Sequence, residues 1–144
     1  MKNSDLYRII DANLNRSREG LRVCEEIARF ALSSPNLTKE LKSVRHAISL
    51  IAKTHYRQRG ALSCARDSVN DVGRVSKKPS EMRRSGFSGI FSANAQRAKE
   101  SLRVLEEFYK LKDKKISTRF SRLRFRVYEI ERKASGRIEA LRNN

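Results

Sequence analysis

Two segments of the chain carry the same polar residues at the same helical spacing. An arginine offers a planar guanidinium fork that suits phosphate, a carboxylate can orient that arginine, and an amide can both donate and accept hydrogen bonds. The two sets are Asn13, Arg16, Glu19 and Arg22 and, 81 positions later, Asn94, Arg97, Glu100 and Arg103. Nine of fifteen residues are identical between 12–26 and 93–107, and most of these are polar. Core packing requires only apolar character, so we interpret both sets as candidate binding residues.

The same residues also have a purely structural interpretation. Arg16, Glu19, Arg22 and Glu26 lie three or four positions apart, which is the spacing of ion pairs along a helix surface. Such pairs stabilise an exposed helix by only about 0.2–0.5 kcal/mol each. One copy alone favours this interpretation, whereas the duplication favours binding.

Two residues of the first copy are poor helix formers within a helical pattern. Asn13 and Gly20 lie at the border between the polar stripe and the apolar face. An asparagine in a helix interior is unfavourable unless its side chain is bonded, and a glycine leaves room for a close neighbour. We therefore expect a specific hydrogen bond at Asn13 and a close approach at Gly20.

A long stretch between the two copies, residues 60–87, lacks helical periodicity and contains a second group of candidate residues. A loop of this length in a compact domain is usually functional or disordered. Arg66, Asp67, Asp71 and Gly73 can together hold a magnesium ion and a phosphate, because Mg²⁺ is typically bound by one or two carboxylates plus substrate phosphates. Aspartate and glycine also occur in any solvated turn. We take Asp67, Asp71 and Arg66 as candidate catalytic residues, and the two aspartates as candidate metal ligands.

Four helices are predicted to position these groups. The first is expected to be capped by Ser4 and to run to about residue 32, where Ser33-Ser34-Pro35 stops it. Thr38 is expected to cap the second, which fades between residues 56 and 60. The third is expected over 88–112, and an apolar stripe from residue 116 to 141 predicts the fourth.

The repetition extends beyond the polar motif. The apolar stripe of the second helix aligns with that of the fourth at an offset of 79, and Arg45 aligns with Arg124. The repeat unit is thus a helical hairpin, over about 5–58 and 88–141. We predict an all-α four-helix bundle in which two hairpins are related by approximate twofold symmetry, in a single domain over 1–144. In this arrangement the two polar stripes can face one another across a shared cleft.

Composition limits the classes of function. A net charge of +17 indicates an anionic partner or a generally basic proteome, but says nothing about the fold. Cys24 and Cys64, with His46 and His55, match no metal-ligand spacing, so two idle thiols are expected. The start of the chain lacks the apolar segment of a signal peptide, and no stretch is long and apolar enough for a membrane span. We expect a cytoplasmic protein.

Several motifs together resemble a known family. They are 8–16, 19–22, Ala65-Arg66-Asp67-Ser68, Asp71-Val72-Gly73, Ala93-Asn94 with Arg97 and Glu100, and 102–107. In this order, over roughly residues 6–130, they resemble the alternative hydroxymethylpyrimidine phosphate kinase domain that is often fused in front of thiamine phosphate synthase. Two positions depart from the family pattern, where threonine is common: Ser68 keeps a hydroxyl, and Arg74 replaces the second threonine.

The resemblance implies transfer of a phosphoryl group from ATP to 4-amino-5-hydroxymethyl-2-methylpyrimidine phosphate, with Mg²⁺, in thiamine biosynthesis. The arginines would then surround the phosphates, Glu19 and Glu100 would orient them or bind the pyrimidine's amino group, and Asn13 and Asn94 would bind the base edge. No Walker A or glycine-rich kinase loop is present. The synthase domain does not follow here, so we expect the coupling step to occur elsewhere, on a separate thiamine phosphate synthase.

Three other interpretations stay open at this stage. A binding module without catalysis would deliver a pyrimidine phosphate and tolerate loss of Asp67 and Asp71. A nucleic-acid-binding helical protein would use the basic surface, although aromatic residues are few, no recognition motif is present, and the glutamates oppose a phosphate backbone. A purely structural bundle would use the motif for stability alone. The regular stripe of the fourth helix also permits a homodimer.

Overall fold

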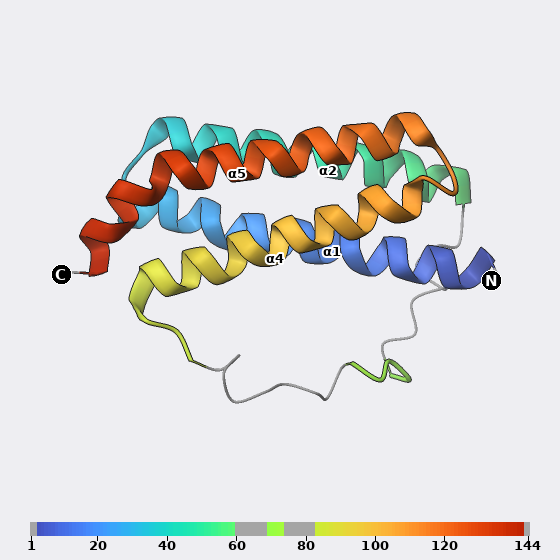
Figure 1. Cartoon of the computed structure of the whole chain (residues 1–144), viewed down its shortest axis with the longest axis horizontal. Helices are drawn as coiled ribbons and strands as arrows, with labels where there is room; N and C mark the ends of the chain where they lie inside the picture. Colours follow the sequence, from blue (N-terminus) through green and yellow to red (C-terminus); the bar gives the residue numbers. More distant parts are fainter. Residues whose placement is uncertain (1–2, 60–68, 74–82, 143–144) are drawn as a thin grey trace.

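Four long α-helices form the fold in this computed structural model, which describes residues 3–59, 69–73 and 83–142 (Figure 1). They are α1 (Asn3–Glu26), α2 (Pro35–Arg59), α4 (Gly86–Tyr109) and α5 (Lys114–Arg142), and a π-helical turn, η1 (Ile27–Ala31), extends α1. The described residues include no strand. The predicted all-α bundle is confirmed. None of the helices in the described ranges is long and apolar enough to cross a membrane.

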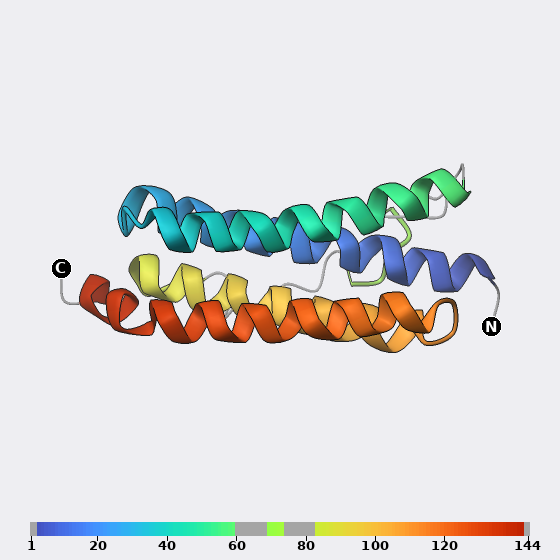
Figure 2. The same cartoon turned by 90° about the horizontal axis from the view of Figure 1, so that it is seen from above.

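The helices pack as two antiparallel hairpins lying against each other. Figure 2 shows α1 with α2 on one side and α4 with α5 on the other. The helices α1 and α4 run side by side in opposite directions and make the main contact between the hairpins (Figure 1). The polar motifs lie on these two inner helices, so the packing of α1 on α4 decides how they are placed.

Two predicted helix caps were wrong. Ser4 lies inside α1, which already includes Asn3. The second helix begins at Pro35, and the hydroxyl of Ser34 accepts the backbone N–H of Leu37 (3.3 Å), whereas Thr38 donates to the Ser34 carbonyl (2.7 Å). Ser34 is the cap because proline suits the first helical position, where no N–H is needed. The other bounds agree with the prediction to within a few residues, as is usual for helix ends.

The core is a continuous apolar cluster between the four helices. Its largest fully buried side chains include Tyr109, Phe91, Phe120, Ile10 and Leu14. Most residues of the two predicted apolar stripes are buried, namely Leu41, Val44, Ile48, Ile51, Phe120, Leu123, Val127, Ile130, Ala134 and Ile138. Ile116 is partly buried, and the side chain of Leu141 lies outside the described residues. Cys24 is a free, buried thiol, and Cys64 lies outside the described residues.

The closest contact between the inner helices occurs at Gly20. A Cβ atom at this position would lie 2.8 Å from the backbone carbonyl oxygen of Asn94 and 3.5 Å from the nitrogen of Ala98. Only a residue without a side chain lets the two backbones approach this closely. The expected close neighbour at Gly20 is therefore confirmed, and it comes from the second copy of the motif.

Candidate functional site

A cavity of about 380 Å³ opens beside the first half of α1. Its lining comprises Asp5, Arg8, Ile9, Ala12, Asn13, Arg16 and Asp71. Six of these seven residues follow one another at intervals of one or three positions between 5 and 16, which places them on one face of the helix. Asp71 is contributed by the described part of the long loop. The cavity thus joins a loop residue, Asp71, with two residues of the first motif copy, Asn13 and Arg16.

The two arginines of the cavity are available to a ligand. Arg8 and Arg16 are both exposed, and neither makes a hydrogen bond or ion pair within the part of the chain that the structure describes. Guanidinium groups are always charged and bind phosphate through two parallel hydrogen bonds. This side of α1 can therefore hold a phosphorylated molecule.

Asn13 is oriented by a local hydrogen bond. Its side-chain Nδ2 donates to the carbonyl of Ile9 at 2.9 Å, and the residue is 5% exposed. The expected side-chain hydrogen bond of Asn13 is confirmed, and its acceptor lies in the preceding turn of the same helix. Because the NH₂ group is held there, the side-chain oxygen is the atom left to accept a hydrogen bond from a ligand.

Carboxylates from two elements reach the same cavity. Asp5 comes from the first turn of α1, and Asp71 accepts the backbone N–H of Gly73 on its Oδ1 (2.9 Å). Oxygen ligands of this kind suit Mg²⁺. The other two loop candidates, Arg66 and Asp67, lie outside the described residues. Within the described ranges no three histidine, cysteine or acidic side chains lie close enough to hold a metal ion by themselves.

Arg22 and Arg103 are placed differently, because both are engaged in ion pairs. Arg22 lies 3.5 Å from Glu25 and 3.3 Å from Glu26, and Arg103 makes the matching pairs with Glu106 and Glu107 at 3.2 and 3.0 Å. Both arginines are about half exposed. Neither lines the α1 cavity. Their predicted role in phosphate binding stays a prediction, and their observed contacts are those of an ion-pair network.

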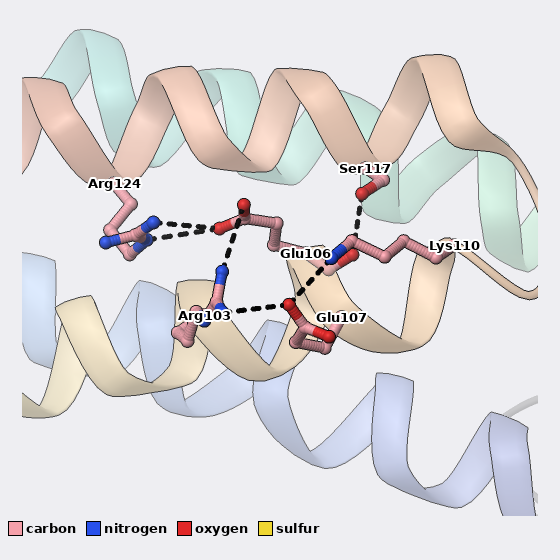
Figure 3. A network of polar contacts seen from close by, with 6 residues as sticks. All are labelled: Arg103, Glu106, Glu107, Lys110, Ser117 and Arg124. Carbon is pink, nitrogen blue, oxygen red and sulfur yellow. Dashed lines mark hydrogen bonds and ion pairs between the residues drawn. The ribbon is translucent and has the colours of Figure 1, made fainter.

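A buried carboxylate holds each of these networks together, and Figure 3 shows the network around Glu106. Glu106 accepts from Arg124 of α5 at 3.1 and 3.2 Å, and its backbone carbonyl accepts the hydroxyl of Ser117 at 2.6 Å. In the other hairpin, Arg45 of α2 binds Glu25 and donates to both of its carboxylate oxygens. The alignment of Arg45 with Arg124 was the sequence signal for these contacts, although it did not identify their partners.

The remaining residues of the second copy do not reach the α1 cavity. Asn94, Arg97 and Glu100 are absent from its lining. Asn94 donates from Nδ2 to the carbonyl of Ile90 at 2.8 Å, and Glu100 accepts from Gln96 at 3.0 Å. Glu19 also lies outside the cavity lining. The structure thus brings together Asn13, Arg16 and Asp71, and adds Asp5 and Arg8, which sequence reasoning missed.

A second polar cluster lies on the α2-facing side of α1. Tyr56 donates its hydroxyl to Asp11 at 2.7 Å, and burial together with this carboxylate raises the pKa of Tyr56. His55, fully enclosed, has Nδ1 3.0 Å from Nζ of Lys112. Burial and the lysine charge lower the pKa of His55 to about 4, so it is neutral at pH 7. No motif in the sequence indicated this cluster.

Comparison with known proteins gives a matching family and several similar proteins. The ThiD2 family matches residues 8–133. Thiamine-phosphate synthases from a Synechocystis species, a Nostoc species and Rhodopirellula baltica are 44%, 40% and 37% identical, over 88%, 91% and 91% of this chain. The matched region is 35–36% of each of these relatives, so the chain spans about a third of their length. No solved structure matches the chain.

Proposed function

This chain belongs to the ThiD2 family, and from that premise we propose that it phosphorylates 4-amino-5-hydroxymethyl-2-methylpyrimidine phosphate for thiamine biosynthesis. ATP is the donor and Mg²⁺ the metal. An oxygen of the acceptor phosphate attacks the γ-phosphorus of ATP, the bond to ADP breaks, and the pyrimidine diphosphate forms. The names of the relatives support the pathway, and we propose that a separate thiamine-phosphate synthase consumes the product.

The observation that carries this proposal is the α1 cavity. Phosphoryl transfer depends on positioning and on positive charge around the transferring oxygens, with little covalent chemistry for the protein to perform. Arg8 and Arg16 supply such charge, and Asn13 presents an acceptor oxygen that suits the amino group of the pyrimidine. A volume of about 380 Å³ lies within the usual range of small-molecule sites.

The donor set also fits the metal. Asp71 and Asp5 present carboxylates beside the two arginines, so a magnesium ion held there would lie next to the bound phosphates. Bound Mg²⁺ neutralises charge on the phosphate oxygens. Asp67 remains a proposed second ligand from the loop. The residues of the chain bind and orient the two substrates around this position.

We also propose that the two hairpins are duplicated units related by an approximate twofold axis. Asn13 and Asn94 make the same bond to the carbonyl four residues earlier. Glu25 and Glu106 each bind an arginine of the following helix, at Arg45 and Arg124. Equivalent contacts in both hairpins support a common origin.

The experiment is a turnover assay of the purified full chain. Mg-ATP is supplied with and without the pyrimidine phosphate, ADP release is followed, and the diphosphate is identified by mass. A preparation of Arg16→Gln, purified identically, controls for contaminating kinases. Pyrimidine-dependent ADP and the diphosphate are the expected result. A raised melting temperature without turnover would instead identify a binding module. The absence of both turnover and a raised melting temperature would overturn the proposal.

A further inference from the structure

The two copies of the motif differ in the groups that surround them. We propose that the first copy alone binds the phosphorylated ligand, and that Arg8 is the binding residue that distinguishes it from the second copy. This inference rests on the proposed function, because it assigns the ligand of that site to one copy. It also names a site residue, Arg8, that the repeated motif does not contain.

Equivalent positions of the two copies differ in charge. At an offset of 81, Asn13 and Arg16 recur as Asn94 and Arg97, but the charged residues before them do not recur. The non-matching pairs are Asp5 with Gly86, Arg8 with Gly89, and Asp11 with Ser92. The second copy therefore keeps one guanidinium where the first has two, and it has neither of the two preceding carboxylates.

The space beside the helix also differs between the two copies. Around Arg8 the flank of α1 is open as a cavity. At the equivalent Gly89, a Cβ atom would lie 2.8 Å from the hydroxyl oxygen of Ser85, and the Gly89 N–H donates to the Ser85 carbonyl at 3.2 Å. The serine that precedes α4 thus fills the space in which a side chain at Gly89 would lie.

The cavity-lining residues of α1 are spaced along the length of the helix. Arg8 and Arg16 are eight residues apart, which is about 12 Å along a helix. Asn13 lies between them, 5% exposed, with its acceptor oxygen in no hydrogen bond within the described ranges. A ligand whose base contacts Asn13 can therefore place phosphoryl groups toward both guanidinium groups. The pyrimidine monophosphate together with the donor's phosphates provides such groups.

The second copy contributes to helix packing, whereas the first copy binds the ligand. The Asn94 carbonyl meets Gly20 at the closest approach of α1 and α4. Lys99, which occupies the position of Arg18, is buried and pairs with Glu131 of α5 at 2.6 Å. These contacts hold α4 between its neighbours.

Binding of the pyrimidine phosphate to the full chain, measured by calorimetry in the presence of a non-hydrolysable ATP analogue, tests the assignment. Arg8→Gln and Arg16→Gln are each expected to weaken binding about tenfold or more, since each removes a charge-assisted hydrogen bond. Arg97→Gln is the discriminating variant and should change the Kd less than twofold. Arg119→Gln, on the exposed side of α5, controls for the loss of one positive charge. Inorganic pyrophosphate is a second probe for the pair of arginines.

The outcomes separate this inference from the proposed function. Equal weakening by Arg97→Gln and Arg16→Gln would overturn the assignment to one copy, and turnover by the wild type would still uphold the kinase. Unchanged affinity in Arg8→Gln would remove Arg8 from the site. Binding that depends on Arg8 and Arg16, in a protein without turnover, would support the assignment and contradict the kinase. A wild type that binds neither probe would overturn both.

Discussion

Arg45 donates from Nε and Nη2 to the two carboxylate oxygens of Glu25, at 2.7 and 3.3 Å, and so ties α2 to α1. The Glu25 side chain is only 6% exposed. A buried carboxylate is tolerated when it is paired and hydrogen-bonded. The packing of the hairpins therefore explains the repeated glutamates Glu25 and Glu106.

Replacing Arg45 should destabilise the fold. In Arg45→Met, Glu25 keeps only the half-exposed Arg22 beside it, so its burial is poorly compensated. Loss of one partner of a buried pair costs about 3–5 kcal/mol, and the remaining arginine should reduce this to about 2–3 kcal/mol. Urea denaturation measures the free energy of unfolding. Arg132→Met, which removes an exposed pair with Glu129, is the control and should cost less than about 1 kcal/mol. Equal effects in both variants would contradict the argument.

Gly20 should tolerate no side chain. In Gly20→Ala the new methyl group would meet the Asn94 carbonyl at 2.8 Å, and a backbone atom cannot move aside as a flexible side chain can. Overpacking of this kind typically costs about 1–3 kcal/mol. The control is Gly136→Ala on α5, where no atom lies within 4 Å of the added Cβ. Alanine is the better helix former by up to about 1 kcal/mol, so this variant should be stabilised. A neutral Gly20→Ala in urea denaturation would mean that the helices cross less closely.

His55 should make stability depend on pH. Its pKa is lowered from 6.5 to about 4, chiefly by burial and also by Lys112, so the folded state favours the neutral ring. Below pH 6.5 the unfolded chain takes up a proton that the folded chain does not, and stability falls as the pH drops toward 4. The full loss is about 3 kcal/mol. Unfolding free energies at pH 7 and 5 should differ less in His55→Gln than in the wild type. His46→Gln, at an exposed position, should keep the wild-type difference.

The sequence was sufficient to predict the helices but insufficient to predict which residues line the cavity. Apolar residues at intervals of three and four positions depend only on helix geometry, which is why the stripes of α2 and α5 were predicted correctly. The cap at Thr38 was wrong because Ser34-Pro35 offered a better start. Arg8 and Asp71 line the same cavity because the described loop residues 69–73 lie beside α1, and no local pattern encodes that placement. The pairing of Arg22 with Glu25 could not be predicted from the sequence, because it depends on the burial of that glutamate against α2.

Substitution of Asp71 should affect the rate of the proposed reaction more than the affinity for the pyrimidine phosphate. If its carboxylate holds the metal, Asp71→Asn should lower the rate of ADP release about tenfold or more, since an amide is a weaker ligand for Mg²⁺ than a carboxylate. The affinity for the pyrimidine phosphate without ATP should change little, because Arg8, Asn13 and Arg16 remain. Raising the Mg²⁺ concentration should restore part of the rate, which a loss of folding would not permit. Turnover that is unchanged in the Asp67→Asn, Asp71→Asn double variant would remove the loop carboxylates from the mechanism and leave charge from the arginines as the main contribution of the protein.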